Sequence, residues 1–393
     1  MRTKQQIKLA LIELTSEVAK MNGSIRVGNL FGIPFFVNVS WFIVLGLMTI
    51  NYGGSLGAQF PQLGVIGAFS LGLVASLLLF ASVLAHELGH SFVAIRQGID
   101  VKSITLFLFG GLASLDKEAK TPSGAFSIAI AGPAVSLVLF AAFSALAASN
   151  IVNGSMGAVV NLLAYINLAL AAFNLIPGLP LDGGNVLKAA VWKLTGNPHK
   201  GVLFASRVGQ GIGWLGISIG LLPVFLNGSF PNIWTILIGW FLLQNAGALA
   251  FDAKLRDKLS QWTAADAITP DSPIVSEALS LRELANEYLI GHEAINRVFV
   301  TNSQGQWVGQ LMVNQMREIP TSQWPLVTVK ELVEPINELM TVDAEQSLLD
   351  VITLLEKEQI SAIPVVREGM ILGLIEKASI RQLLQQKVQV RPA

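Results

Sequence analysis

Long stretches without a charged side chain dominate the chain as far as Phe251. No Asp, Glu, Lys or Arg occurs in residues 27–85, 121–181 or 208–251. One membrane-spanning helix needs about 20 apolar residues, so each stretch is long enough for two helices joined by a short turn. We therefore predict six transmembrane helices, near residues 33–50, 64–94, 124–148, 157–175, 203–226 and 232–251.

Each charge-free stretch contains one segment that is typical of a turn. These segments read "NYGGSLGAQFPQLG", "SNIVNGSMG" and "NGSFPN", and they consist largely of Gly, Asn, Ser and Pro. Lys and Arg occur instead before the first helix and in the opposite connections, at Arg2, Lys4, Lys8, Lys20, Arg26, Arg96, Lys102, Lys117, Lys120, Lys188, Lys193, Lys200 and Arg207. Since connections rich in Lys and Arg remain in the cytoplasm, we predict that both termini are cytoplasmic.

The pattern changes after Phe251, where the charged segment "DAKLRDKLSQW" begins. Two similar units follow at residues 298–316 and 363–380, each with an apolar strand, a glycine turn, a second strand and a helix. Gly305 and Gly309 of the first unit recur as Gly369 and Gly373 of the second. A repeat of this size predicts paired modules that bury a common face.

These patterns divide the chain into four parts. We expect an amphipathic segment on the membrane surface at residues 1–24 and a six-helix domain at residues 25–252. The two modules are expected at residues 260–318 and 333–390.

Composition agrees with a membrane protein and excludes some kinds of chemistry. Only 13% of the 393 residues are charged, whereas about 25% is usual for a soluble domain. Lys and Arg balance Asp and Glu at 26 each, which does not favour a nucleic-acid partner. The chain has no cysteine, so disulfides, thiolate metal ligands and cysteine nucleophiles are excluded.

The segment "LAHELGH" places ionisable side chains inside the second predicted helix. His86 and His90 stand four residues apart, so both imidazoles lie on one face and can reach one metal ion. Glu87 points away from that pair and is suited to act as a base on metal-bound water. Arg96 ends the helix about 15 Å further along, so the cluster lies deep in the membrane, where ionisable groups are usually functional. The alternative is that His and Glu only cap the helix at the interface.

A catalytic zinc ion needs a third protein ligand, and "NLIPGLPLDGG" offers one. Pro177 and Pro180 end the fourth span, and Asp182 then begins a new helix. Asp182 is the expected third ligand, and the alternative is that it caps this helix. The Asn174 amide is expected to hold the substrate carbonyl, and a packing or capping role is its alternative. We predict one zinc ion per chain.

The two motifs together resemble the site-2 protease family of intramembrane zinc metalloproteases. HELGH in one span and N-x-x-P-x-x-P-x-L-D-G in a later span carry the resemblance, which covers residues 25–250. It implies hydrolysis of peptide bonds in or near the transmembrane segment of a membrane-anchored protein, such as an anti-sigma factor or a tethered regulator. Lipid is the other expected partner.

Two further segments fit this resemblance. Gly132 and Pro133 in "AGP" are expected to kink the third helix and to let it approach the zinc site closely. Residues 101–116 are expected to form a short hairpin that dips into the membrane and offers its edge to an unwound substrate. A plain amphipathic connection is the alternative for these residues.

The C-terminal repeat resembles a pair of CBS modules, which commonly bind adenine nucleotides. The expected fold class is therefore an α-helical polytopic membrane protein with six transmembrane helices and a C-terminal α/β tandem CBS domain. Neither "GQLMVNQ" nor "GLIEKAS" contains the Asp that binds a ribose in such modules. In the second module, Glu376 and Ser379 occupy this part of the motif. We therefore expect weak nucleotide binding, with dimerisation or gating as alternative roles. A transporter or channel gated by CBS modules is the alternative function, and an inactive scaffold is disfavoured because every expected ligand is present.

Overall fold

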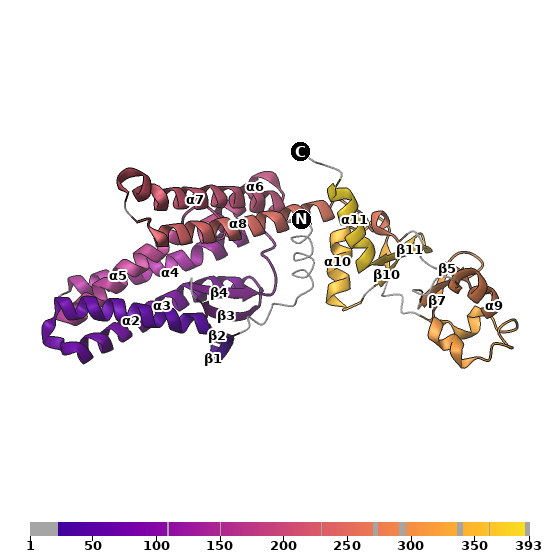
Figure 1. Cartoon of the computed structure of the whole chain (residues 1–393), viewed down its shortest axis with the longest axis horizontal. Coiled ribbons are helices and arrows are strands. Elements are labelled where there is room, and N and C mark those ends of the chain that lie inside the picture. Colours follow the sequence, from indigo (N-terminus) through magenta and orange to yellow (C-terminus); the bar gives the residue numbers. More distant parts are fainter. Residues whose placement is uncertain are drawn as a thin grey trace. The chain divides into compact units, whose positions relative to one another are not determined.

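The computed structural model of the chain describes residues 23–107, 110–149, 151–228, 230–269, 274–290, 295, 297–335, 341–360 and 362–389. The chain forms two compact units that divide between Lys254 and Leu255 (Figure 1). The predicted amphipathic segment at residues 1–24 lies outside the described residues except for its last two positions.

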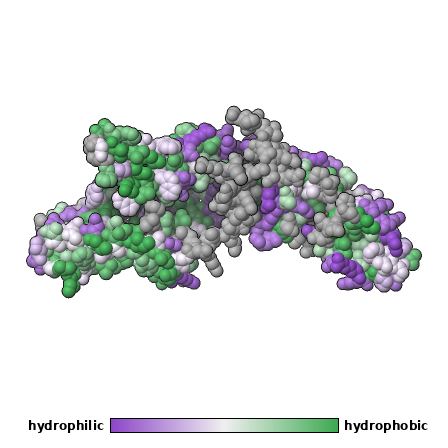
Figure 2. Space-filling view, viewed as in Figure 1, coloured by the Kyte–Doolittle hydropathy of each residue, from purple (hydrophilic) through white to green (hydrophobic). Residues whose placement is uncertain are grey.

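Six helices in the described part of the chain are long and apolar enough to cross a membrane. They are α2 (Val39–Gln59), α3 (Gly64–Arg96), α4 (Pro122–Ala148), α5 (Gly154–Asn174), α7 (Pro198–Asn227) and α8 (Ile233–Leu259). Apolar side chains cover much of the visible surface of these helices (Figure 2). The predicted number of spans is confirmed, and the chain is a multi-pass membrane protein.

The predicted boundaries of the first span are wrong at both ends. Residues Ile33–Asn38 form strand β2, and α2 begins only at Val39, where the Asn38 side chain accepts a hydrogen bond from Ser40 N. The helix then continues through the predicted turn as far as Gln59, and the chain turns at the short 3-10 helix η1 (Pro61–Leu63).

Glycine in this segment serves helix packing. A Cβ added to Gly72 of α3 would lie 2.6 Å from Gly53 N of α2, so both backbones meet without a side chain between them. Such close approach at small residues is a common way for membrane helices to associate. The glycine that we interpreted as a turn residue therefore holds two spans together.

A four-stranded sheet lies beside α3 in the same unit (Figure 1). Its order is β1 (Ser24–Leu30), β2, β3 (Val101–Phe107) and β4 (Gly110–Leu115), with β2 and β3 parallel and the other pairs antiparallel. The hairpin predicted at residues 101–116 is confirmed, whereas β1 and β2 were not predicted. Beyond β3, β4 pairs with no other strand among the described residues, so its second edge is open.

The fourth span ends where the prolines predict. α5 stops at Asn174, and α6 (Asp182–Thr195) starts after a connection of turns and bends and packs against α4 and α7. A side chain at Gly183 or Gly184 would collide with the backbone of this segment. The two glycines therefore let the first turn of α6 fold tightly against the end of α5.

The second unit contains two small sheets. One has the order β5 (Ile274–Ser276), β6 (Arg297–Thr301), β7 (Trp307–Met312) and β8 (Glu334–Pro335), and the other has the order β11 (Met370–Glu376), β10 (Ala362–Arg367) and β9 (Val342–Asp343). Its helices are α9 (Leu281–Leu284), α10 (Leu348–Lys357) and α11 (Lys377–Gln389), with the short helices η2 (Ala264–Ala267), η3 (Ala285–Leu289), η4 (Val313–Glu318) and η5 (Val329–Leu332).

The predicted repeat is visible in both sheets. Gly305 and Gly369 have φ angles of 75° and 80° in the turns of the β6–β7 and β10–β11 hairpins. This left-handed conformation favours glycine, which explains why the residue recurs. The two repeats differ after the hairpin. The first continues into the 3-10 helix η4, where we expected an α-helix, whereas the second continues into α11.

Candidate metal centre

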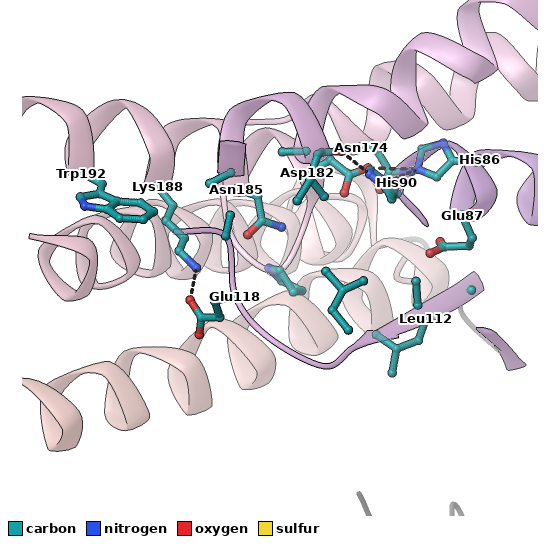
Figure 3. Close-up of a pocket in the computed structure, with 18 residues that line it drawn as sticks. His86, Glu87, His90, Leu112, Glu118, Asn174, Asp182, Asn185, Lys188 and Trp192 are labelled. Atoms are coloured by element: carbon teal, nitrogen blue, oxygen red, sulfur yellow. Dashed lines mark hydrogen bonds and ion pairs between the residues drawn. The ribbon is translucent and has the colours of Figure 1, made fainter. Parts of the chain in front are cut away.

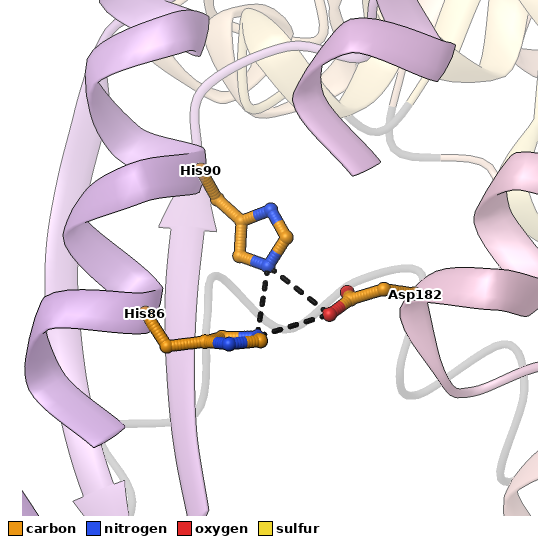
Figure 4. Close-up of side chains that lie close together, drawn as sticks. All are labelled: His86, His90 and Asp182. Atoms are coloured by element: carbon orange, nitrogen blue, oxygen red, sulfur yellow. Dashed lines mark hydrogen bonds and ion pairs between the residues drawn. The ribbon is translucent and has the colours of Figure 1, made fainter. Parts of the chain in front are cut away.

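Three side chains from two distant segments converge between α3 and α6 (Figure 4). The Nε2 atoms of His86 and His90 lie 3.3 Å apart, as their spacing of one helical turn predicts. Asp182 Oδ2 lies 3.0 Å from His86 Nε2 and 3.3 Å from His90 Nε2. The three side chains are mostly buried, with exposed fractions of 4%, 12% and 17% for His86, His90 and Asp182.

The second nitrogen of each imidazole is held by α4. His90 Nδ1 lies 2.6 Å from the Ile128 carbonyl oxygen, which can only accept, so Nδ1 carries the proton and donates it there. His86 Nδ1 lies 2.9 Å from the Ser136 hydroxyl oxygen, which can accept in the same way. Both Nε2 atoms then point lone pairs toward the same space, as metal ligands do.

The spacing of these atoms fits a zinc ion. Zinc–nitrogen and zinc–oxygen distances of about 2.0–2.2 Å in a tetrahedral site separate neighbouring ligand atoms by roughly 3.3 Å. The three measured separations, 3.0, 3.3 and 3.3 Å, agree with that value. Two unprotonated nitrogens so close together repel each other unless a cation lies between them.

Gly132 of α4 keeps the space beside the ligand atoms open. A Cβ at this position would collide with His90 Nε2 and would lie 2.6 Å from His86 Nε2. The expected close approach of the third span at Gly132 is confirmed, and α4 continues through the neighbouring Pro133 to Ala148.

Asp182 occupies the first position of α6, and Leu181 is the residue that precedes the helix as its N-cap. The Asp182 carboxylate therefore faces the two histidines from the start of the helix. The geometry favours the ligand interpretation over the capping alternative.

Glu87 and Asn174 line the same cavity of about 330 Å³ as the three ligand-type residues (Figure 3). Strand β4 forms the wall opposite Glu87, since Gly111, Leu112 and Ala113 line it too. A Cβ at Gly111 would lie 3.0 Å from Glu87 Oε1, so glycine lets the strand pass directly against this carboxylate.

Several cavity residues were not predicted. Asn185 and Lys188 follow Asp182 on α6 at intervals of three residues, and helical periodicity would have placed them on its face. Ser136 lies four residues after Gly132 on α4, which the same counting would have found. The role of the Ile128 carbonyl had no signal in the sequence, because any residue supplies a carbonyl.

Comparison with known proteins decides the family. The family model of peptidase family M50 matches residues 74–152 and 143–215. A curated relative from Synechocystis sp., named "Putative zinc metalloprotease sll0528", is 54% identical over 366 residues, which cover 93% of this chain and 96% of the relative.

The chain belongs to peptidase family M50.

A second curated relative also covers most of the chain. "Putative zinc metalloprotease Rip3" from Mycobacterium tuberculosis is 30% identical over 374 residues, which cover 93% of each chain. A solved structure, "Site-2 Protease from Methanocaldococcus jannaschii", is 30% identical, with a TM-score of 0.43, covering 58% of this chain and 95% of that chain. The CBS domain family model matches residues 329–386, which include most of the second predicted module at residues 333–390. This M50 chain is therefore related to proteins named as zinc metalloproteases, and it contains a C-terminal CBS domain.

Proposed function

We propose that the chain is an intramembrane zinc endopeptidase that hydrolyses peptide bonds in or near the transmembrane segment of a membrane-anchored protein. One observation carries this proposal. His86, His90 and Asp182 meet at tetrahedral spacing in a cavity that also contains Glu87, within a unit built of membrane-spanning helices. Family membership supports proteolysis over the alternative of a CBS-gated transporter, which has no need for a base beside three metal ligands.

His86, His90 and Asp182 are the proposed ligands of one zinc ion per chain. When bound, zinc supplies a Lewis acid and lowers the pKa of bound water to about 7. The Ile128 carbonyl and the Ser136 hydroxyl keep both imidazoles turned toward the ion, and partners of this kind typically raise metal affinity by about 10–100-fold.

Glu87 is the proposed general base and acid. Its carboxylate accepts a proton from the attacking water as the new carbon–oxygen bond forms, and then donates it to the amide nitrogen as the carbon–nitrogen bond breaks. Asn174 lines the same cavity, and its amide is the proposed donor of a hydrogen bond to the substrate carbonyl oxygen, where negative charge develops.

The open edge of β4 supports a way of holding the substrate. A transmembrane helix keeps its carbonyl groups in internal hydrogen bonds, so the bond to be cut must first unwind. An extended segment can then pair with β4, whose residues line the cavity beside Glu87. The proposed substrates are membrane-anchored proteins such as anti-sigma factors or tethered regulators.

Zinc removal tests the proposed reaction. Purified full-length protein in lipid vesicles is expected to cleave a membrane-anchored substrate, to lose this activity after chelation and to regain it with about one equivalent of zinc per chain. Cleavage that persists in protein shown to be metal-free would contradict the proposal. The same assay with and without ATP tests whether the CBS unit regulates cleavage, and an unchanged rate would argue against regulation by that nucleotide.

We also propose that the connections rich in Lys and Arg, and both termini, lie in the cytoplasm. The chain has no cysteine, so single cysteines can be labelled without background. Lys200→Cys is expected to react with a membrane-impermeant maleimide only after cells are opened, whereas Ile151→Cys, whose parent side chain is 78% exposed, should react on intact cells. The reverse pattern would invert the proposed orientation.

A further inference from the structure

One face of α6 forms a wall of the catalytic cavity and leads away from the proposed zinc ligands. Asp182, Asn185, Lys188 and Trp192 all line the cavity, and their spacing of three, three and four residues places them on one side of the helix (Figure 3). Leu115 at the end of β4 and Glu118 in the following connection line the facing wall. The cavity is therefore a groove between α6 and the segment that contains the open strand edge.

Lys188 is the only Lys or Arg among the described residues that line this groove. Its Nζ lies 3.1 Å from Glu118 Oε2. The two side chains differ strongly in exposure, because Lys188 is only 17% exposed whereas Glu118 is 78% exposed. A mostly buried lysine side chain is thus paired with the carboxylate of a mostly exposed glutamate.

We propose that Lys188 forms a subsite that binds a carboxylate of the substrate. In this subsite an acidic side chain of the substrate replaces Glu118 as the partner of the Lys188 ammonium group. This inference rests on the proposed protease function. Lys188 lies six residues from Asp182, or about 9 Å along α6, and an extended peptide advances about 3.3 Å per residue. The acidic residue is therefore expected about three residues from the bond that is cut.

Exposure explains why the partner can change. A largely buried ammonium group needs a carboxylate close by, since leaving it unpaired is costly. Glu118 contributes little through this pair, because its side chain is 78% exposed and the surrounding water screens the interaction. A substrate carboxylate held along β4 replaces Glu118 at little cost and adds a charge-assisted hydrogen bond to the bound complex.

The inference is distinct from a purely structural role for the Lys188–Glu118 pair. A structural tie between α6 and the connection after β4 would affect all substrates alike when it is removed. A subsite instead gives a preference for acidic residues at one position of the substrate, and reversing the charge of Lys188 inverts that preference.

The test is a charge scan of one membrane-anchored substrate, cleaved by full-length enzyme in vesicles. The parent substrate has Gln at the second to fourth positions on each side of the cleaved bond, and each Gln is replaced singly by Glu or Lys. We expect Glu at one position to raise kcat/KM about tenfold for the wild type. This preference should vanish in Lys188→Gln, turn toward Lys in Lys188→Glu and increase in Glu118→Gln, because Glu118 no longer competes.

Lys193→Gln is the matched control, since Lys193 lies on the same helix, is exposed and does not line the groove. It should keep the wild-type preference. If the wild type cleaves the Gln substrate but shows no acidic preference at any position, or if Lys188→Gln keeps the preference, the subsite is overturned while the protease function stands. Failure of the wild type to cleave any substrate overturns both.

Discussion

Glu87→Gln is expected to lower kcat for a membrane-anchored substrate by a factor on the order of 10² or more. Gln preserves the size of the side chain that packs against Gly111 but cannot accept the proton of the attacking water. Zinc content should remain near that of the wild type, because Glu87 points from α3 toward β4 and is not among the three converging ligand atoms (Figure 3). The measurements are single-turnover cleavage and metal analysis on the same preparation.

Glu87→Asp is the matched variant for this prediction. It keeps a carboxylate but withdraws it by one methylene group, so we expect activity between those of the wild type and Glu87→Gln. Wild-type cleavage by Glu87→Gln would remove Glu87 from the proton transfer. Loss of zinc from this variant would show that the carboxylate helps to hold the metal.

Asp182→Ala is expected to abolish stable zinc binding. A catalytic zinc site usually has three protein ligands. Without Asp182, only the two histidines would remain as protein ligands, and water would have to fill the other coordination positions. The loss in affinity should exceed the roughly 10–100-fold that loss of an outer partner such as Ser136 would cause. Zinc per chain after dialysis against a weak chelator is the measurement.

Asn185→Ala provides the control for Asp182→Ala, because Asn185 lies one turn further along α6 and lines the same cavity. It should retain zinc through the same dialysis. Full zinc occupancy in Asp182→Ala would exclude Asp182 as a ligand, and loss of zinc from both variants would indicate a general disturbance of α6.

The main features of the candidate site follow from local rules that a sequence displays. His86 and His90 are brought together by the pitch of one helix, and no other part of the chain is needed to predict it. Asp182 is found because Pro177 and Pro180 end a span in a charge-free stretch and a carboxylate follows. The combination of Asp182 with the two histidines followed from the need for a third zinc ligand, and the family resemblance supported it. The helix packing that brings these residues together is long-range and could not be predicted from local patterns.

The start of the first span shows what hydropathy cannot resolve. "IPFFVN" is as apolar as the helix that follows it, and a short apolar segment of this kind fits a buried strand as well as a helix. The strand is held by pairing with the neighbouring β1 and also with β3, which lies more than 60 residues away in the chain. Ser136 and Lys188 were missed although helical counting from Gly132 and Asp182 would have found them.

The open edge of β4 also limits how lipid can surround this part of the chain. Backbone N–H and C=O groups without partners cost several kcal/mol each in hydrocarbon, so lipid chains cannot cover the edge when no substrate is bound. Any part of this edge that lies at the depth of the hydrocarbon therefore needs water or a substrate strand as its partner, apart from the Ala113 backbone, which has a hydrogen bond with the Glu87 carboxylate. Water bound at this edge lies next to Glu87, the proposed base. It can therefore supply the water molecule that the proposed hydrolysis consumes.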